Sequence, residues 1–194
     1  MSLQIRKIAV FASGTGTNAE NLIQYFMESR IASVVVVFTN RAEAGVIERA
    51  KPYGVPVIIF DKKQFYDSDE VINNLKMRMI DWVVLAGFLL KIPPKFIAAF
   101  PGRIVNIHPA LLPKFGGKGM YGSHVHQAVI DSGDAESGIS IHLIDENYDR
   151  GEIVFQAKVK VEESDSPGTL AKKIHQLEQK YFPSVVEKLV TGTE

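Results

Sequence analysis

The sequence predicts an α/β protein built on a doubly wound, mostly parallel sheet, with an antiparallel hairpin in the C-terminal half. Three observations predict this class. Short β-branched runs alternate with helical patterns along the chain, residues 34–37 are all valine, and the last two β-branched runs are joined by a short, turn-rich connection. A strand made only of valine is typical of a parallel strand buried on both faces.

The individual elements follow in chain order from the same patterns. Apolar, β-branched runs predict strands at residues 7–12, 33–38, 57–60, 82–86, 103–107, 138–144 and 153–161. Helical periodicity predicts helices at residues 18–29, 41–53, 68–80, 93–100, 123–132 and 166–190. The last helix should be interrupted near Pro183, because proline lacks the amide hydrogen that a helix interior needs. Residues 108–122 form a long glycine-rich loop, which in a compact domain is usually functional.

Composition narrows the class of protein further. A chain of 194 residues suits one domain. Its 22 Lys and Arg balance 22 Asp and Glu, so the protein has no net positive charge that would attract nucleic acid or an anionic membrane. The absence of cysteine excludes disulfides, thiolate metal sites and a cysteine nucleophile. Residues 1–12 hold too short an apolar run for a signal peptide, and no segment approaches the ~20 apolar residues of a membrane span. We therefore expect a soluble, cytoplasmic protein.

Asn106 and His108 break the apolar pattern of the fifth predicted strand. Side chains alternate along a strand, so these two residues point the same way. Pro109 forces His108 into an extended conformation at the carboxyl end of the strand, where open α/β sheets bind their ligands. An amide beside an imidazole can stabilise an oxyanion and supply an acid, although two satisfied polar residues at a surface strand end fit the same pattern.

Residues 13–18, Ser-Gly-Thr-Gly-Thr-Asn, lie between the first predicted strand and the first predicted helix. The glycines let backbone amides approach an anion, the hydroxyls add donors, and the start of the helix adds a partial positive charge. The loose dinucleotide pattern G-x-G-x-x-A also matches, but the second strand ends in Thr-Asn-Arg rather than in an acid. A monophosphate therefore fits better than NAD, and a tight turn without a ligand is the alternative.

An acidic connection, residues 145–151, joins the last two predicted strands. Its Asp-x-Gly ending is ordinary turn chemistry, but a carboxylate near His108 would favour the imidazolium and raise the pKa of His108. His124, His126 and His142 invite a metal hypothesis. No obvious carboxylate accompanies them, so we expect no catalytic metal.

The motifs in this order resemble those of the glycinamide ribonucleotide transformylases, the folate-dependent phosphoribosylglycinamide formyltransferases of purine biosynthesis. The most specific segment is residues 106–113, Asn-Ile-His-Pro-Ala-Leu-Leu-Pro, which is similar to the N-x-H-P-S-L-L-P signature of formyltetrahydrofolate-using enzymes. Residues 13–18, Leu-Ala-Gly-Phe at 85–88 and Asp-x-Gly at 149–151 support it. The resemblance spans essentially the whole chain and implies a Rossmann-like formyltransferase fold. It also implies a single domain over residues 1–194, with a phosphate-binding half to about residue 100 and a folate-binding, catalytic half from about residue 101.

The resemblance also implies the reaction and the roles of individual residues. The formyl group of 10-formyltetrahydrofolate, the co-substrate, would pass to the amine of glycinamide ribonucleotide, without a metal or a covalent enzyme intermediate. The catalytic group would be Asn106, His108 and Asp149, and the phosphate and ribose would contact Gly16, Thr17, Asn18, His175 and Glu178. The folate would contact Leu89, Leu90, Lys91, Ile92, Asn106, Asp145, Glu146, Asn147, Tyr148 and Asp149.

Three residues depart from the family pattern. His175 stands where glutamine is common, Leu90 replaces a frequent arginine, and Arg150 replaces the first glycine of the usual Asp-Gly-Gly. Residues 116–123 are longer and richer in glycine than in the compact bacterial enzymes, and whether this loop closes over a substrate is not readable from the sequence.

Other formyl-folate enzymes remain alternatives. A tRNA formyltransferase is expected to carry an added basic carboxy-terminal domain, and a deformylase an added amino-terminal one. A non-catalytic nucleotide-binding module is a third alternative. The family includes homodimers, but the sequence leaves the oligomeric state open.

Overall fold

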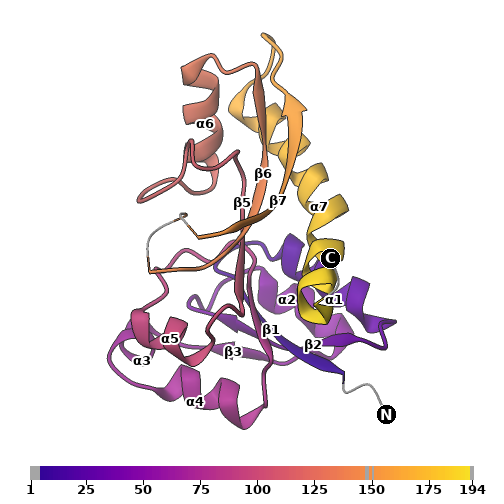
Figure 1. Ribbon diagram of the computed structural model, residues 1–194, viewed down its shortest axis with the longest axis vertical. Helices are drawn as coiled ribbons and strands as arrows, with labels where there is room; N and C mark the ends of the chain where they lie inside the picture. The colour runs from indigo at the N-terminus through magenta and orange to yellow at the C-terminus, as the bar shows by residue number, and fades with distance from the viewer. Residues whose placement is uncertain (1–4, 147–148, 150, 193–194) are drawn as a thin grey trace.

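A computed structural model describes residues 5–146, 149 and 151–192 of the chain (Figure 1). Within these residues seven strands form one sheet in the order β3-β2-β1-β4-β5-β6-β7. The strands are β1 (Arg6–Phe11), β2 (Ala32–Thr39), β3 (Val57–Ile59), β4 (Trp82–Leu85), β5 (Ile104–His108), β6 (Glu136–Leu143) and β7 (Ile153–Lys160). The pairs among β1 to β5 are parallel, whereas β6 runs antiparallel to both β5 and β7. The predicted mostly parallel sheet with a C-terminal antiparallel hairpin is confirmed.

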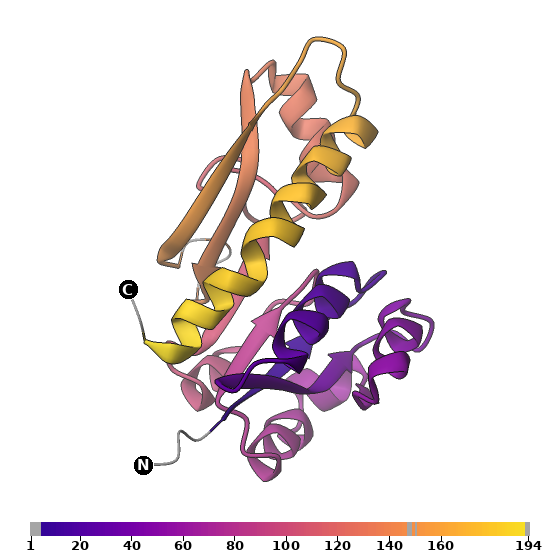
Figure 2. The ribbon, with the colours of Figure 1, turned by 90° about the vertical axis from the view of Figure 1, so that its right-hand side faces the viewer.

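Helices cover both faces of the sheet, because each apolar face must be buried. One face packs against α1 (Thr17–Met27), α2 (Val46–Ala50) and α7 (Pro167–Thr191), and the other against α3 (Lys62–Tyr66), α4 (Glu70–Met77) and α5 (Pro94–Ala99). A further helix, α6 (Ser123–Ser132), contacts α7. Figure 2 shows α7 running along the molecule from the hairpin to the N-terminal half. None of the helices in this described part of the chain is long and apolar enough to cross a bilayer.

The apolar pattern of the strands supplies two buried layers, one on each side of the sheet. The layer under α1 and α7 includes Val10, Val37 and Ile139, and the opposite layer includes Phe11 and Phe38. The rings of Phe11 and Phe38 stack with centroids 4.8 Å apart. The valine strand is buried along most of its length, as its composition predicts.

The structure shortens one predicted helix and adds one that was not predicted. The helix expected at residues 41–53 begins only at Val46, after Gly45 has packed against the backbone of Thr15, and it ends in a 3-10 turn at Lys51–Tyr53 that contains a proline. A short helix, α3, was not predicted, and the reciprocal hydrogen bonds of Asp61 and Gln64 begin it.

The predicted interruption near Pro183 is wrong. Pro183 lies inside the continuous helix α7, where it is buried beside Phe182 and Val185. Proline removes one helix hydrogen bond, and the packing of these apolar neighbours against the sheet compensates for the loss.

The strand order reverses at β1, which lies between β2 and β4. Loops that leave β1 and β4 therefore diverge and open a crevice at the carboxyl ends of the strands. Ser13, which is 1% exposed, joins the two loops. Its amide donates to the carbonyl of Gly87 at 3.0 Å, and its hydroxyl accepts from the amide of Leu89 at 3.0 Å and donates to Asn40 Oδ1 at 2.6 Å.

Candidate active site

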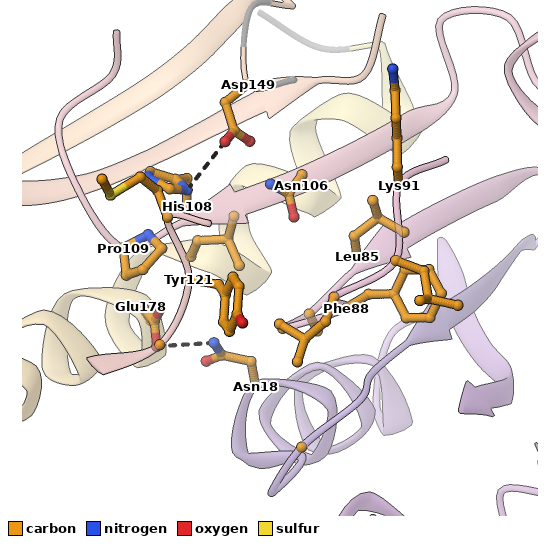
Figure 3. Close-up of a pocket in the computed structure, with 18 of the residues that line it drawn as sticks. Asn18, Leu85, Phe88, Lys91, Asn106, His108, Pro109, Tyr121, Asp149 and Glu178 are labelled. Atoms are coloured by element: carbon orange, nitrogen blue, oxygen red, sulfur yellow. Dashed lines mark hydrogen bonds and ion pairs between the residues drawn. The ribbon is translucent and has the colours of Figure 1, made fainter. Parts of the chain in front are cut away.

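A cavity of about 530 Å³ lies at this crevice. It is bounded by the loop after β1, the loop after β4, the end of β5, the loop of residues 117–122, and α7. Figure 3 shows side chains from these separate segments pointing into one opening. Cavities of this size at the switch point of an α/β sheet are the usual place for ligands.

The glycine loop forms one end of the cavity. Gly16 has a φ of 82° and lies so close to Val46 that an added Cβ would be 2.5 Å from the Val46 Cα, which explains why glycine stands there. Helix α1 begins at Thr17, so its first amides face the cavity. Gly16, Thr17 and Asn18 thus form an anion-binding geometry at a helix start.

Glu178 of α7 faces Asn18 across this end of the cavity. Its Oε2 atom accepts from Asn18 Nδ2 at 3.0 Å and lies 3.1 Å from His175 Nδ1 (Figure 3 draws the Asn18 bond). The hydrogen bond with Glu178 raises the pKa of His175. Two of the residues expected to contact the phosphate and ribose, His175 and Glu178, therefore lie together beside the glycine loop.

Asn106 and His108 lie on β5 and both line the cavity, as the alternation of a strand requires. His108 is only 4% exposed. Its Nε2 lies 2.8 Å from the carbonyl of Phe115, which accepts the ring hydrogen, and its Nδ1 lies 3.9 Å from Asp149 Oδ2. The ring nitrogen that faces the carboxylate is therefore Nδ1.

The pKa of His108 is lowered, in contrast to the expectation from the sequence. Burial of the ring disfavours the imidazolium and is the largest influence, and it outweighs both the negative charge of Asp149 and the Phe115 carbonyl, which raise the pKa. Burial lowers the pKa of His108 by more than Asp149 raises it, although Asp149 acts in the direction expected from the sequence.

Asp149 completes the group from the connection between β6 and β7. Its backbone adopts a left-handed φ of 49°, which aspartate tolerates better than most residues, and its Oδ2 accepts from the amide of Gly117 at 2.8 Å. Burial raises the pKa of Asp149, but the neighbouring His142, the hydrogen bond from the Gly117 amide and the His108 ring lower it by more, so the net pKa is below its ordinary value. Asp149 is thus held as a carboxylate beside His108.

His142, which the sequence suggested only as a metal candidate, is a site residue beside Asn106. It is fully buried on β6, directly opposite Asn106 in the antiparallel register. Its Nδ1 lies 3.1 Å from the Leu143 carbonyl, and its Nε2 lies 3.0 Å from Asn106 Nδ2 and 3.6 Å from Asp149 Oδ1. With Nδ1 donating to the carbonyl, Nε2 accepts from the amide of Asn106 and fixes its orientation.

The segment after β4 forms the other end of the cavity. Leu89, Leu90, Lys91 and Ile92 all line it, together with Phe88 and with Asp145 from the β6–β7 connection. Glu146 is exposed and is not among the lining residues. Asn147, Tyr148 and Arg150, which the sequence analysis also named, lie outside the described residues.

The loop of residues 117–122 closes one side of the cavity. Gly117, Gly119 and Gly122 all have positive φ values, which explains the glycine-rich composition of the segment. Tyr121 is 49% exposed and points into the opening (Figure 3). The wall of the cavity also includes His126, from the start of α6. In residues 5–146, 149 and 151–192, no group of three or more His, Asp or Glu side chains is arranged to hold a metal ion.

Fold and site define an α/β protein whose polar cavity lies at the switch point of its sheet. Residues 6–186 match the formyl transferase family. The chain is 42% identical over 187 residues to the chloroplastic phosphoribosylglycinamide formyltransferase of Arabidopsis thaliana, and this match covers 93% of the chain but 64% of that relative. It is 33% identical to phosphoribosylglycinamide formyltransferase of Bacillus subtilis, with 96% of this chain and 95% of the relative covered.

Solved structures agree with these matches. The crystal structure of phosphoribosylglycinamide formyltransferase from Bacillus halodurans superposes with a TM-score of 0.87 at 38% identity and covers 97% of both chains. The chain belongs to the formyl transferase family. The chain spans somewhat less than two thirds of the length of the plant relatives that it matches.

Proposed function

We propose that the protein transfers the formyl group of 10-formyltetrahydrofolate to the amine of glycinamide ribonucleotide, a step of purine biosynthesis. One observation carries the proposal. A single cavity is lined by the glycine loop and Glu178, by residues 89–92, and by Asn106, His108 and Asp149. Figure 3 shows Asn18 and Glu178 on one side of the opening, Lys91 on the opposite side and Asn106 between them. This order suits two substrates that meet at the polar group, one held by its phosphate and the other by its pterin.

The proposed chemistry is direct attack of the amine on the formyl carbon, which gives a tetrahedral intermediate with a negatively charged oxygen. Asn106 Nδ2 carries two hydrogens, and one of them bonds His142 Nε2 at 3.0 Å, so the other is left to donate to this oxygen. His108 already donates from Nε2 to Phe115, so its ring acts through Nδ1 and, when protonated, through its positive charge. Loss of one such donor typically costs around 10²- to 10³-fold in rate.

Protons must also move from the attacking amine to the folate nitrogen that departs. The 3.9 Å between His108 Nδ1 and Asp149 Oδ2 is too long for a direct hydrogen bond. A water or a substrate oxygen can bridge the two atoms at ordinary hydrogen-bond distances, and this bridge offers a route for the proton. The depressed pKa of Asp149 keeps it a carboxylate, and its negative charge favours the imidazolium of His108, which can carry the proton in transit.

The test is to mix the protein with 10-formyltetrahydrofolate and to follow the folate absorbance with and without glycinamide ribonucleotide. The proposal expects loss of the formyl group only when the ribonucleotide is present, with one formylated ribonucleotide for each tetrahydrofolate released. Loss without the ribonucleotide would instead identify a deformylase, and no loss would identify a binding module.

Two alanine variants make this test specific to the cavity. Asn106→Ala should slow the transfer, whereas Asn73→Ala, at an exposed position of α4, should leave it unchanged. Equal rates for the two variants would mean that the transfer does not take place in this cavity.

A further inference from the structure

His126 is a buried imidazole to which the proposed reaction gives no role. It lies in α6 and is 7% exposed, and its Nδ1 is buried without a hydrogen-bond partner among the described residues. The other two buried imidazoles differ in this respect. His108 bonds the Phe115 carbonyl, and His142 contacts Leu143 and Asn106. A buried nitrogen without a partner destabilises the fold, so an apolar residue would suit this position better if packing were its only role.

Part of the ring lines the cavity, although the Nδ1 atom itself is closed off from solvent. His126 lines the same cavity as Asn18, His175 and Glu178, and it lies close enough to Glu178 and His108 for both to influence its charge. It therefore belongs to the part of the cavity wall that lies near both Glu178 and His108.

The chemistry of this part of the cavity wall is suited to a hydroxyl. Burial lowers the pKa of His126, so the ring is neutral, with one nitrogen that donates and one that accepts. Glu178 uses Oε2 for its bonds to both Asn18 and His175, which leaves Oε1 to accept from a ligand. A neutral imidazole and a carboxylate oxygen together match the vicinal hydroxyls of a sugar better than they match an anion or a cation.

We infer that His126 is a substrate-binding residue that hydrogen-bonds one ribose hydroxyl of the ribonucleotide. The neighbouring ribose hydroxyl would donate a hydrogen bond to Glu178. This inference rests on the proposed function, because that function places a ribose between the phosphate and the reacting amine. It adds a residue of α6 to a site that the sequence assigned only to the glycine loop and α7. The role is recognition of the sugar and is separate from the transfer of the formyl group.

The test measures binding by calorimetry without folate, so that no turnover occurs. Two ligands are compared, glycinamide ribonucleotide and its 2′,3′-dideoxy analogue. His126→Phe should weaken binding of the ribonucleotide about tenfold, the effect of one lost hydrogen bond, and should leave the dideoxy analogue unchanged. His124→Phe is the matched control, because His124 lies two residues earlier in the same helix, is exposed and does not line the cavity.

Two further variants keep the test decisive if the phenylalanine variant does not fold. Asparagine places an amide near the position of Nδ1, and glutamine places one near Nε2, so one of His126→Asn and His126→Gln should restore most of the affinity. The inference is overturned if both variants fold and both bind the ribonucleotide and the dideoxy analogue more weakly than the wild type does. That result would assign His126 a packing role.

The remaining outcomes separate this inference from the proposed function. A folded His126→Phe protein that binds the ribonucleotide as tightly as the wild type overturns the inference alone, provided that the wild type transfers the formyl group. A wild-type protein without ribonucleotide-dependent transfer overturns the proposed function. In that case, weaker binding of the ribonucleotide by His126→Phe, with the dideoxy analogue unaffected, would still support the contact to the sugar.

Discussion

Replacement of Asp149 by asparagine removes one charge and little else. The amide oxygen of asparagine can still accept from Gly117, so the loop should keep its position. The charge that is lost lies 3.9 Å from His108 Nδ1, and both side chains are largely buried. At an effective dielectric constant of about 20, a carboxylate and an imidazolium at that distance attract each other by about 4 kcal/mol.

This attraction sets the size of the expected effect. Part of the attraction is offset by the cost of burying the two charges. Each 1.4 kcal/mol added to the activation free energy slows the reaction tenfold, so kcat should fall about 10²- to 10³-fold. KM for the ribonucleotide should change less, because Asp149 lies away from the glycine loop. The pKa of His108 should fall further, because burial then acts without the opposing carboxylate.

The assay is the formyl transfer rate at saturating substrates, measured against pH for the wild type, for Asp149→Asn and for Asp134→Asn, a carboxylate outside the cavity. Raising the pH removes the His108 proton, so the alkaline limb of kcat should move to lower pH in Asp149→Asn and stay in place in Asp134→Asn. A full rate in Asp149→Asn would remove Asp149 from the mechanism. A slower rate with an unmoved limb would refute the electrostatic link to His108.

The remaining predictions concern four other positions. Asn106→Ala should lower kcat at least about tenfold while the protein still folds, and normal turnover would contradict its role as a donor. His142→Phe takes away the acceptor that orients Asn106, so kcat should fall about tenfold with little change in the KM of either substrate. An unaltered kcat would count against this orienting role of His142. Gly16→Ala would place a Cβ against Val46 at a residue with a φ of 82°, so the free energy of unfolding, measured in urea, should fall by roughly 2 to 4 kcal/mol. An unfolding free energy equal to that of the wild type would refute the clash. The hydrogen bond from Lys173 lowers the pKa of Asp165 from 3.8 to about 2, so Asp165→Asn should lower Tm at neutral pH. That difference should disappear as the pH falls through about 2, and a difference that persists would rule out the ion pair as its cause.

Most of the fold follows from local patterns. The valines of β2 and the short apolar runs of β1 and β4 report burial on both faces, so the strands were predictable without any knowledge of their partners. The late start of α2 was not predictable, because it depends on the contact between Gly45 and Thr15, which are 30 residues apart in this sequence. The helix α3 has too few residues for a periodic signal, although the Asp61 and Gln64 pair was a readable start.

The site was predictable to a similar extent. The side chains of Asn106 and His108 reach one cavity because alternation along a strand is a local rule. His142 was missed because its position opposite Asn106 depends on the register of β5 and β6, which no local pattern specifies. The net pKa of His108 was also out of reach, since it depends on how deeply the folded chain buries the ring.

The buried hydroxyl of Ser13 has a mechanical consequence under the proposed function. It is bonded on one side to the loop after β4 and on the other to Asn40 after β2, and the glycine loop continues directly from it. Ser13 therefore ties the glycine loop to the segment after β4. Under the proposed function these two segments would hold the two substrates, so a change at Ser13 is expected to misalign the amine and the formyl carbon without touching either.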